Sequence, residues 1–212
     1  MKNTIRHWLW KFLGMRYFQY LEGQNKTYLH KAKNTTIGFK TYHNGAFVWQ
    51  WYGKSSLQIG AYCSIANDVN FILDDGFHLS SEVTSFPHFN HLSDRLLNIG
   101  SQTQSDFKKN TIPKKSNIVI GNDVWIGMNA IVLPNTIVGN GVTIMAGAVV
   151  NGNIPDYAVI GGVPAKIIKM KHDEIAIQKM NDIAWWNWNA SKVEKNVGDF
   201  YLPIHDFIDK WS

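Results

Sequence analysis

The stretch IVIGNDVWIGMNAIVLPNTIVGNGVTIMAGAVVNGNI, residues 118–154, decides the fold. Aliphatic residues recur in it every six positions: Ile120, Ile126, Val132, Val138, Ile144 and Val150. A second series runs two residues earlier: Ile118, Val124, Ala130, Thr136, Val142, Ala148 and Ile154. A helix repeats every 3.6 residues and a strand every two, so neither explains this period. The repeat predicts a solenoid whose coils have three short flat faces, with the aliphatic side chains pointing inward and stacked coil on coil.

Small residues separate the aliphatic positions. Glycine follows the first series at Gly121, Gly127 and Gly139. Glycine and asparagine are favoured where the backbone adopts a positive φ. We therefore expect the corners between faces, with positive φ, at Asn122, Asn129, Asn135 and Asn140.

The same pattern occurs earlier in the chain, in the series Ile59, Ile65, Phe71 and Leu57, Cys63, Val69. Cys63 falls on an inward position, which favours a core thiol over a nucleophile. The 61 residues from Ile59 to Ile120 are not a multiple of six, so residues 74–117 are predicted to form an excursion from the solenoid. Ile37-Gly38 indicates a still earlier coil, and residues 42–52 a smaller, aromatic-rich departure.

The two ends of the chain lack the repeat. Ile5, Trp8, Leu9 and Phe12 have helical spacing and predict a short amphipathic helix within a lead-in, residues 1–36. Packing on the protein or its oligomer is the favoured role of this helix, and weak attachment to a membrane surface is the alternative. The solenoid itself spans residues 37–170. Residues 171–212 predict a cap, a helix followed by a tryptophan cluster, that closes the last coil.

Composition excludes several classes of protein. Charged residues are only 17% of the 212, which excludes a highly charged disordered chain. One cysteine excludes an internal disulfide and a cysteine-cluster metal site. The net charge of +5 is modest, and no basic run interleaved with aromatic residues occurs, so nucleic-acid binding is disfavoured.

Four segments, in this order, resemble a known family: AYCSIANDVNFIL (61–73), VIGNDVWIG (119–127), VIGGVPAKIIK (159–169) and IAWWNW (183–188). They are similar to the hexapeptide-repeat acyltransferases, and more narrowly to the xenobiotic acetyltransferase branch, which includes chloramphenicol and streptogramin acetyltransferases. Relatives of that branch acetylate sugars of bacterial surface polysaccharides. The resemblance implies an all-β fold, a left-handed parallel β-helix, assembled as a homotrimer with active sites between subunits.

The resemblance also implies a general base on the excursion, and the matching residue is His78, with His88 in reserve. Acetyl transfer from a thioester to a hydroxyl needs a base that is neutral near pH 7, which histidine supplies, and it needs no metal. Asp74, Asp75 and His78 form only a weak metal-ligand pattern, and we expect no metal. Glu82 stands where the family typically has tryptophan, which favours a sugar over a flat aromatic drug as the acceptor.

Contacts to acetyl-CoA, carried over from the family, fall on Met128, Ala146, Asn151, Gly152 and Lys166. In this set Lys166 would meet a phosphate. Trp125 either walls the thioester end or packs. Tyr42 and Trp51 are candidates to stack on a pyranose ring, and packing at a trimer interface is the equal alternative.

The sequence thus predicts an acetyl-CoA-dependent O-acetyltransferase (N-acetyl transfer stays open) that acts on a sugar in bacterial surface polysaccharide biosynthesis. Acetylation of chloramphenicol or streptogramin A is the first alternative, and a non-catalytic solenoid scaffold the second. We expect a cytoplasmic protein, or one peripheral to the inner membrane.

Overall fold

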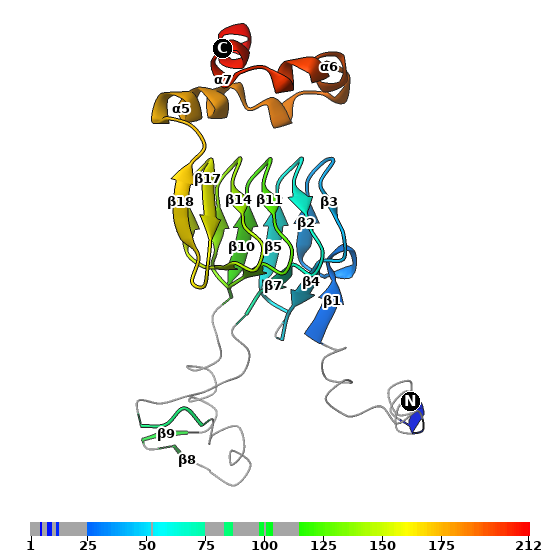
Figure 1. Cartoon of the computed structure of the whole chain (residues 1–212). Helices are drawn as coiled ribbons and strands as arrows, with labels where there is room; N and C mark the ends of the chain where they lie inside the picture. Colours follow the sequence, from blue (N-terminus) through cyan, green and yellow to red (C-terminus); the bar gives the residue numbers. More distant parts are fainter. Residues whose placement is uncertain are drawn as a thin grey trace.

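The computed structural model describes residues 5, 8–9, 12, 25–51, 53–74, 83–86, 98–99, 101–103 and 115–212. Its main body is a parallel β-helix with three faces (Figure 1). The first face contains β2 (Thr35–Ile37), β5 (Ser56–Ile59), β10 (Asn117–Ile120), β13 (Ile137–Val138) and β16 (Asn153–Ile154). The second contains β3 (Tyr42–His43), β6 (Ser64–Ile65), β11 (Trp125–Ile126), β14 (Thr143–Ile144), β17 (Ala158–Gly161) and β18 (Lys166–Met170). The third contains β1 (Lys26–Tyr28), β4 (Phe47–Trp49), β7 (Asn70–Ile72), β12 (Ile131–Val132) and β15 (Val149–Val150).

The period-six series form the core, as predicted. All members of the first series are buried, and so are all of the second except Ile154, which is partly buried. Successive coils pair in parallel with members of one series side by side, for example Ile126 with Ile65 and Ile144. Cys63 is fully buried, and its thiol lies 3.2 Å from the carbonyl oxygen of Gly121. The core-thiol interpretation is therefore confirmed.

The corner prediction is right at two of its four positions. Asn129 and Asn135 have positive φ, 59° and 60°. At the corner between the first and second faces, which we call the first corner, the positive φ belongs instead to the following residues, Asp123 and Gly141. Asn122 and Asn140 serve there as hydrogen-bonding side chains.

These side chains form a ladder along the first corner. The Asn122 side-chain oxygen accepts from the Ala61 backbone N–H at 2.8 Å, and that of Asn140 accepts from the Asn122 N–H at 2.9 Å. Asp156 accepts from the Asn140 N–H at 2.6 Å and from the Asn181 side chain at 2.8 Å. The ladder thus satisfies a backbone donor in each coil and ends on a C-terminal helix.

The glycines of the repeat permit close contact between coils. A Cβ on Gly127 would lie 2.5 Å from the backbone nitrogen of Ala146, and one on Gly121 would lie 2.7 Å from the carbonyl carbon of Gly139. Neither glycine has a positive φ. Steric room, and not backbone freedom, therefore requires glycine at these two positions.

The predicted departure at residues 42–52 is wrong, because most of this stretch is the first regular coil. Tyr42 pairs with Ser64 in the second face, and Val48 pairs with Phe71 in the third. The inward positions run from Ile37 to His43 to Val48, a spacing of six and then five, which breaks the repeat. The larger excursion is confirmed: β5 and β10 are neighbours, with Ile59 opposite Ile120. Within the excursion, β8 (Asn98–Ile99) and β9 (Gln102–Thr103) pair antiparallel.

The C-terminal helices cover the first corner, and not the end of the last coil as predicted. The helices are α5 (Glu174–Ile183), α6 (Ala190–Lys195) and α7 (Ile204–Trp211), with the 3-10 turns η3 (Trp185–Asn187) and η4 (Val197–Tyr201) between them. They lie along the row of turns that joins the first and second faces (Figure 1). Their core contains Trp185, Trp186 and Phe207 and reaches Tyr62 and Tyr157 in those turns. The tryptophan cluster therefore packs, as expected.

Before the solenoid, the 3-10 turn η1 (Leu29–Lys31) buries Leu29. The four described residues of the amphipathic segment, Ile5, Trp8, Leu9 and Phe12, are helical and exposed in the single chain. Among the described residues, no helix is long and apolar enough to cross a membrane.

Candidate acetyl-transfer site

Three of the predicted site residues, Trp51, Asn151 and Gly152, lie at the corner between the third and first faces, which we call the third corner. The excursion leaves the solenoid here, after Leu73 and Asp74, and Ser116 hydrogen-bonds to the Leu73 carbonyl where the excursion returns. Asp74 is 2% exposed, and its carboxylate accepts from the Trp51 backbone N–H at 3.0 Å. This carboxylate therefore fixes the base of the excursion, as a cap would.

Two tryptophans lie beside that base. The rings of Trp49 and Trp51 stack with centroids 5.9 Å apart, and Trp51 is 39% exposed. The Trp49 indole N–H donates to the side chain of Asn70 at 2.9 Å, which holds the pair in place. The aromatic-rich stretch at residues 42–52 contains both tryptophans, but sequence reasoning missed Asn70. The 23-residue offset from Val48-Trp49 to Phe71-Ile72, the length of one coil here, is the signal that would have found it.

The acetyl-CoA candidates border the third face on both sides. Met128 and Ala146 occupy adjacent coils at the corner between the second and third faces, where the Gly147 N–H donates to the Met128 carbonyl at 2.8 Å. Asn151 and Gly152 lie at the third corner, after β15, and Gly152 has a φ of 74°. All four are exposed, so this surface offers small side chains and accessible backbone.

Lys166 reaches the same region from the next coil. The backbone of its neighbour Ala165 donates to the Val149 carbonyl in β15 at 2.8 Å. Lys166 itself begins β18, where it pairs with Gly161 and is exposed. A cation at this place is accessible to an anionic group that lies along β15.

Trp125 and Tyr42 project outward from the second face. Trp125 and Tyr42 both pair with Ser64, so their strands are two spacings apart, about 10 Å. The side chains are 56% and 57% exposed, respectively. Trp125 and Tyr42 thus share a face that does not carry Trp51, and within one subunit they do not meet it.

His78 and Glu82, together with the reserve His88, lie outside the described residues. Burial raises the pKa of the Cys63 thiol, which argues against thiolate chemistry at that residue. In the parts of the chain that the structure describes, no group of three His, Cys, Asp or Glu side chains could hold a metal ion.

Comparison with known proteins identifies relatives. Residues 117–152 match the family model described as bacterial transferase hexapeptide (six repeats). The chain is 32% identical over 158 residues to a probable macrolide acetyltransferase of Lysinibacillus sphaericus, a match that covers 74% of this chain and 83% of the relative. It is 29% identical over 176 residues to a chloramphenicol acetyltransferase of Agrobacterium fabrum, covering 77% and 80%.

A shorter match has a higher identity. Over 61 residues the chain is 56% identical to a putative lipopolysaccharide biosynthesis O-acetyl transferase of Escherichia coli, covering 29% of this chain and 31% of the relative. Among solved structures, a galactoside acetyltransferase in complex with coenzyme A is similar at 25% identity and a TM-score of 0.48, covering 66% of this chain and 57% of that one. From the coverage and identity of the macrolide acetyltransferase match, together with the six-residue repeat, the chain belongs to the hexapeptide-repeat acetyltransferases, and its coils form the left-handed parallel β-helix of that family.

Proposed function

We propose that this protein transfers the acetyl group of acetyl-CoA to a hydroxyl of a sugar in surface polysaccharide biosynthesis. The observation that carries the proposal is the third corner. The stacked Trp49 and Trp51 lie there, beside the base of the excursion that bears His78. The exposed backbone at Asn151 and Gly152 lies along the same corner, two strand spacings or about 10 Å further on.

In this reaction the imidazole of His78 takes the proton of the acceptor hydroxyl while the hydroxyl oxygen attacks the carbonyl carbon of the thioester. The carbon–sulfur bond breaks as the ester forms, and the coenzyme A thiolate leaves and receives the proton from the imidazolium. The acetyl group passes directly, with no acyl-enzyme. Holding both substrates in line is the main task of the site, and rigid coils on either side of the third face suit that task.

Two observations support a sugar acceptor. Stacked, partly exposed tryptophans offer a flat face to a pyranose ring. A relative that is 56% identical over 61 residues is a putative lipopolysaccharide biosynthesis O-acetyl transferase. Antibiotic acetylation is the second candidate, because the relatives named macrolide and chloramphenicol acetyltransferases match over a larger part of the chain.

We further propose a homotrimer with active sites between subunits, and a cytoplasmic location where acetyl-CoA is supplied. The exposed apolar residues Tyr42, Trp125 and Met145 on the second face support an interface there, since isolated chains would leave them in water. Light scattering coupled to size-exclusion chromatography tests the trimer, and a monomer at micromolar concentration would contradict it. The division into lead-in, solenoid and cap at residues 1–36, 37–170 and 171–212 also remains a proposal.

The test of the catalytic assignment is His78→Ala, with His91→Ala as the matched control from the same excursion. We expect His78→Ala to lower the rate of acetyl transfer by about 100- to 10,000-fold, the usual contribution of a general base. His91→Ala should keep the wild-type rate. If His78→Ala keeps that rate and His88→Ala loses it, the base has been assigned to the wrong residue. A native chain that neither binds nor hydrolyses acetyl-CoA would favour the scaffold alternative.

A further inference from the structure

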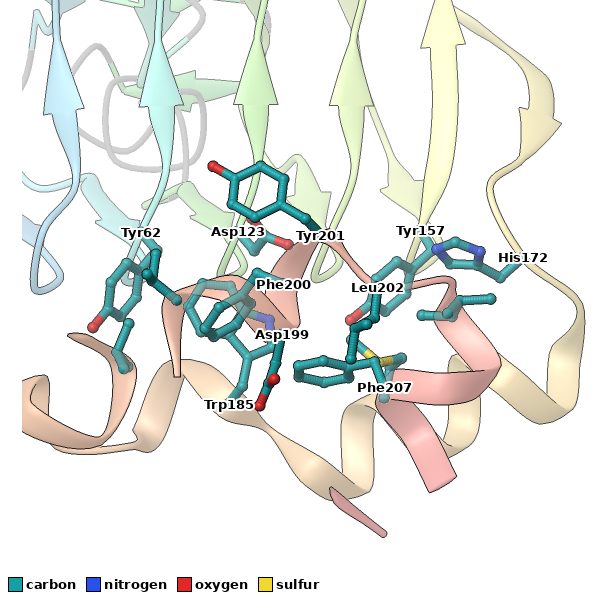
Figure 2. Close-up of a pocket in the computed structure, with 14 residues that line it drawn as sticks. Tyr62, Asp123, Tyr157, His172, Trp185, Asp199, Phe200, Tyr201, Leu202 and Phe207 are labelled. Atoms are coloured by element: carbon teal, nitrogen blue, oxygen red, sulfur yellow. The ribbon is translucent and has the colours of Figure 1, made fainter. Parts of the chain in front are cut away.

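A cavity of about 590 Å³ lies between the first corner and the C-terminal helices (Figure 2). Tyr62, Asp123 and Tyr157 line it from three turns of the solenoid, and Trp185, Phe200 and Phe207 are among the residues that close it from the cap. None of the described residues assigned to acetyl transfer lines this cavity. It therefore needs an explanation of its own.

Tyr157 carries an unsatisfied polar group into this region. The side chain is 97% buried, and its hydroxyl has no hydrogen-bond partner in the described part of the chain. The ring packs over Gly141, where a Cβ would lie 2.5 Å from the ring carbon Cδ1. Buried tyrosine hydroxyls normally have a partner, because leaving one without costs about 1–3 kcal/mol. The hydroxyl is fully buried, so the cavity meets the ring of Tyr157 and not this group.

Asp123 supplies a carboxylate to the cavity. Its position is fixed by a turn with a φ of 55°, and its carboxylate makes no ion pair or hydrogen bond with the described residues. Burial raises the pKa of Asp123 to about 6, although attraction to Lys171 opposes the rise. Asp199 also lines the cavity, but its carboxylate is occupied by Lys210 at 2.8 Å and by the Trp211 indole at 3.2 Å.

The walls are aromatic. The ring centroids of Trp185 lie 4.8 Å from those of both Tyr62 and Phe200. Aromatic faces attract cations in addition to burying apolar groups. The ring centroids of His172 and Tyr157 lie 5.6 Å apart. Burial lowers the pKa of the His172 imidazole, so this residue adds no full positive charge near pH 7.

These groups define the chemistry of the occupant. A carboxylate accepts hydrogen bonds only, so the ligand must supply donors. A carboxylate and aromatic faces together favour a positive charge, and the apolar walls require an apolar body. We propose that this cavity is a second ligand site that binds a small organic ammonium ion, with its charged group at Asp123 and its apolar part against Trp185 and Phe200.

The test is isothermal titration calorimetry of the full chain at pH 8 with three probes of one shape. These are 2-phenylethylamine, which is a cation, 2-phenylethanol, which is neutral, and 3-phenylpropanoate, which is an anion. We expect the amine to bind about tenfold to a hundredfold more tightly than the alcohol, the range of a charge-assisted hydrogen bond. The anion should bind least.

Two variants locate the site. Asp123→Asn should weaken amine binding by about tenfold to a hundredfold. Asp182→Asn is the control, because this substitution removes the same charge outside the cavity. Asp182 is an exposed carboxylate of α5. This control should bind the amine as wild type does. Thermal unfolding of each variant verifies that a loss of binding is not a loss of fold.

The proposal is overturned if the amine does not bind wild type, if amine and alcohol bind equally, or if Asp123→Asn binds as tightly as Asp182→Asn. None of these readouts depends on acetyl transfer. The ammonium site can therefore be disproved while the proposed function stands, and the proposed function can be disproved while the ammonium site stands.

Discussion

The carboxylate of Asp123 should destabilise the empty protein, and Asp123→Asn should remove that cost. Asparagine has nearly the same shape and tolerates the positive φ of this turn, 55°, as well as aspartate does. The substitution therefore changes the charge and little else.

The magnitude follows from the pKa. A rise from 3.8 to about 6 corresponds to about 3 kcal/mol at 1.36 kcal/mol per pKa unit. Water in the open cavity reduces this figure, so we expect about 1–3 kcal/mol in the free energy of unfolding. Because the folded pKa lies above the unfolded one, the protonated carboxyl favours the native state. The penalty is thus absent below pH 3.8 and complete above about pH 6.

The assay is thermal unfolding of wild type and Asp123→Asn at several pH values. For a chain of this length, 1–3 kcal/mol corresponds to a rise in Tm of roughly 2–12 °C, which we expect at about pH 8. At about pH 5 the gain should fall to near half, since much of the native carboxyl is then protonated. A gain that is equal at both pH values, or no gain at pH 8, would show that the carboxylate is not destabilised by burial.

Three further substitutions test the solenoid and the acetyl-CoA surface. In a urea titration, Gly127→Ala should lower the free energy of unfolding by about 3 kcal/mol, because its Cβ would lie 2.5 Å from the backbone of the next coil. Gly198→Ala is the control and should be nearly neutral, because the space around Gly198 is open. Asn140→Ala should cost about 1–3 kcal/mol in that titration, since it removes the 2.9 Å acceptor for a backbone N–H of the ladder, and no loss would mean that the ladder carries no stability. Lys166→Ala should raise the KM for acetyl-CoA roughly tenfold, because it removes a charged contact to a phosphate. Lys169→Ala, on the same strand, should leave the KM unchanged. Equal KM values for the two variants would contradict the assignment of Lys166.

The sequence predicts the faces of the solenoid well, because a period of six has no other structural explanation at this length. Residues such as Ile126 and Val132 occupy their expected inward positions in adjacent faces. The earliest coil was recognised at Ile37, but its second and third faces were missed for the same reason. From His43 to Val48 the spacing shortens to five, and periodicity alone cannot detect strands that break it.

At the corners, residue type alone does not determine which role an asparagine plays. Asparagine suits both a positive φ and a side chain that accepts from a neighbouring backbone N–H. Asn129 takes the first role and Asn140 the second, and only the register of stacked coils distinguishes them.

The sequence also did not predict packing between segments that are far apart in the chain. The sequence indicates a helix and a tryptophan cluster at the C-terminus, but not that Trp185 would pack on Tyr62, more than a hundred residues away. The cavity that holds Asp123 and Tyr157 depends on that packing, so neither residue stood out in the sequence. The base of the excursion was more predictable, because the break in the repeat between Ile59 and Ile120 located it.

The most direct test of the central claim is the release of coenzyme A when the purified protein is mixed with acetyl-CoA and single acceptors. The acceptors are a panel of hexoses and amino sugars, chloramphenicol and streptogramin A. We expect thiol release that depends on a sugar and yields an O-acetylated product by mass spectrometry, with drugs turned over far more slowly. Drug turnover that far exceeds sugar turnover would contradict the proposed acceptor, and no acetyl transfer to any of these acceptors would contradict the account as a whole.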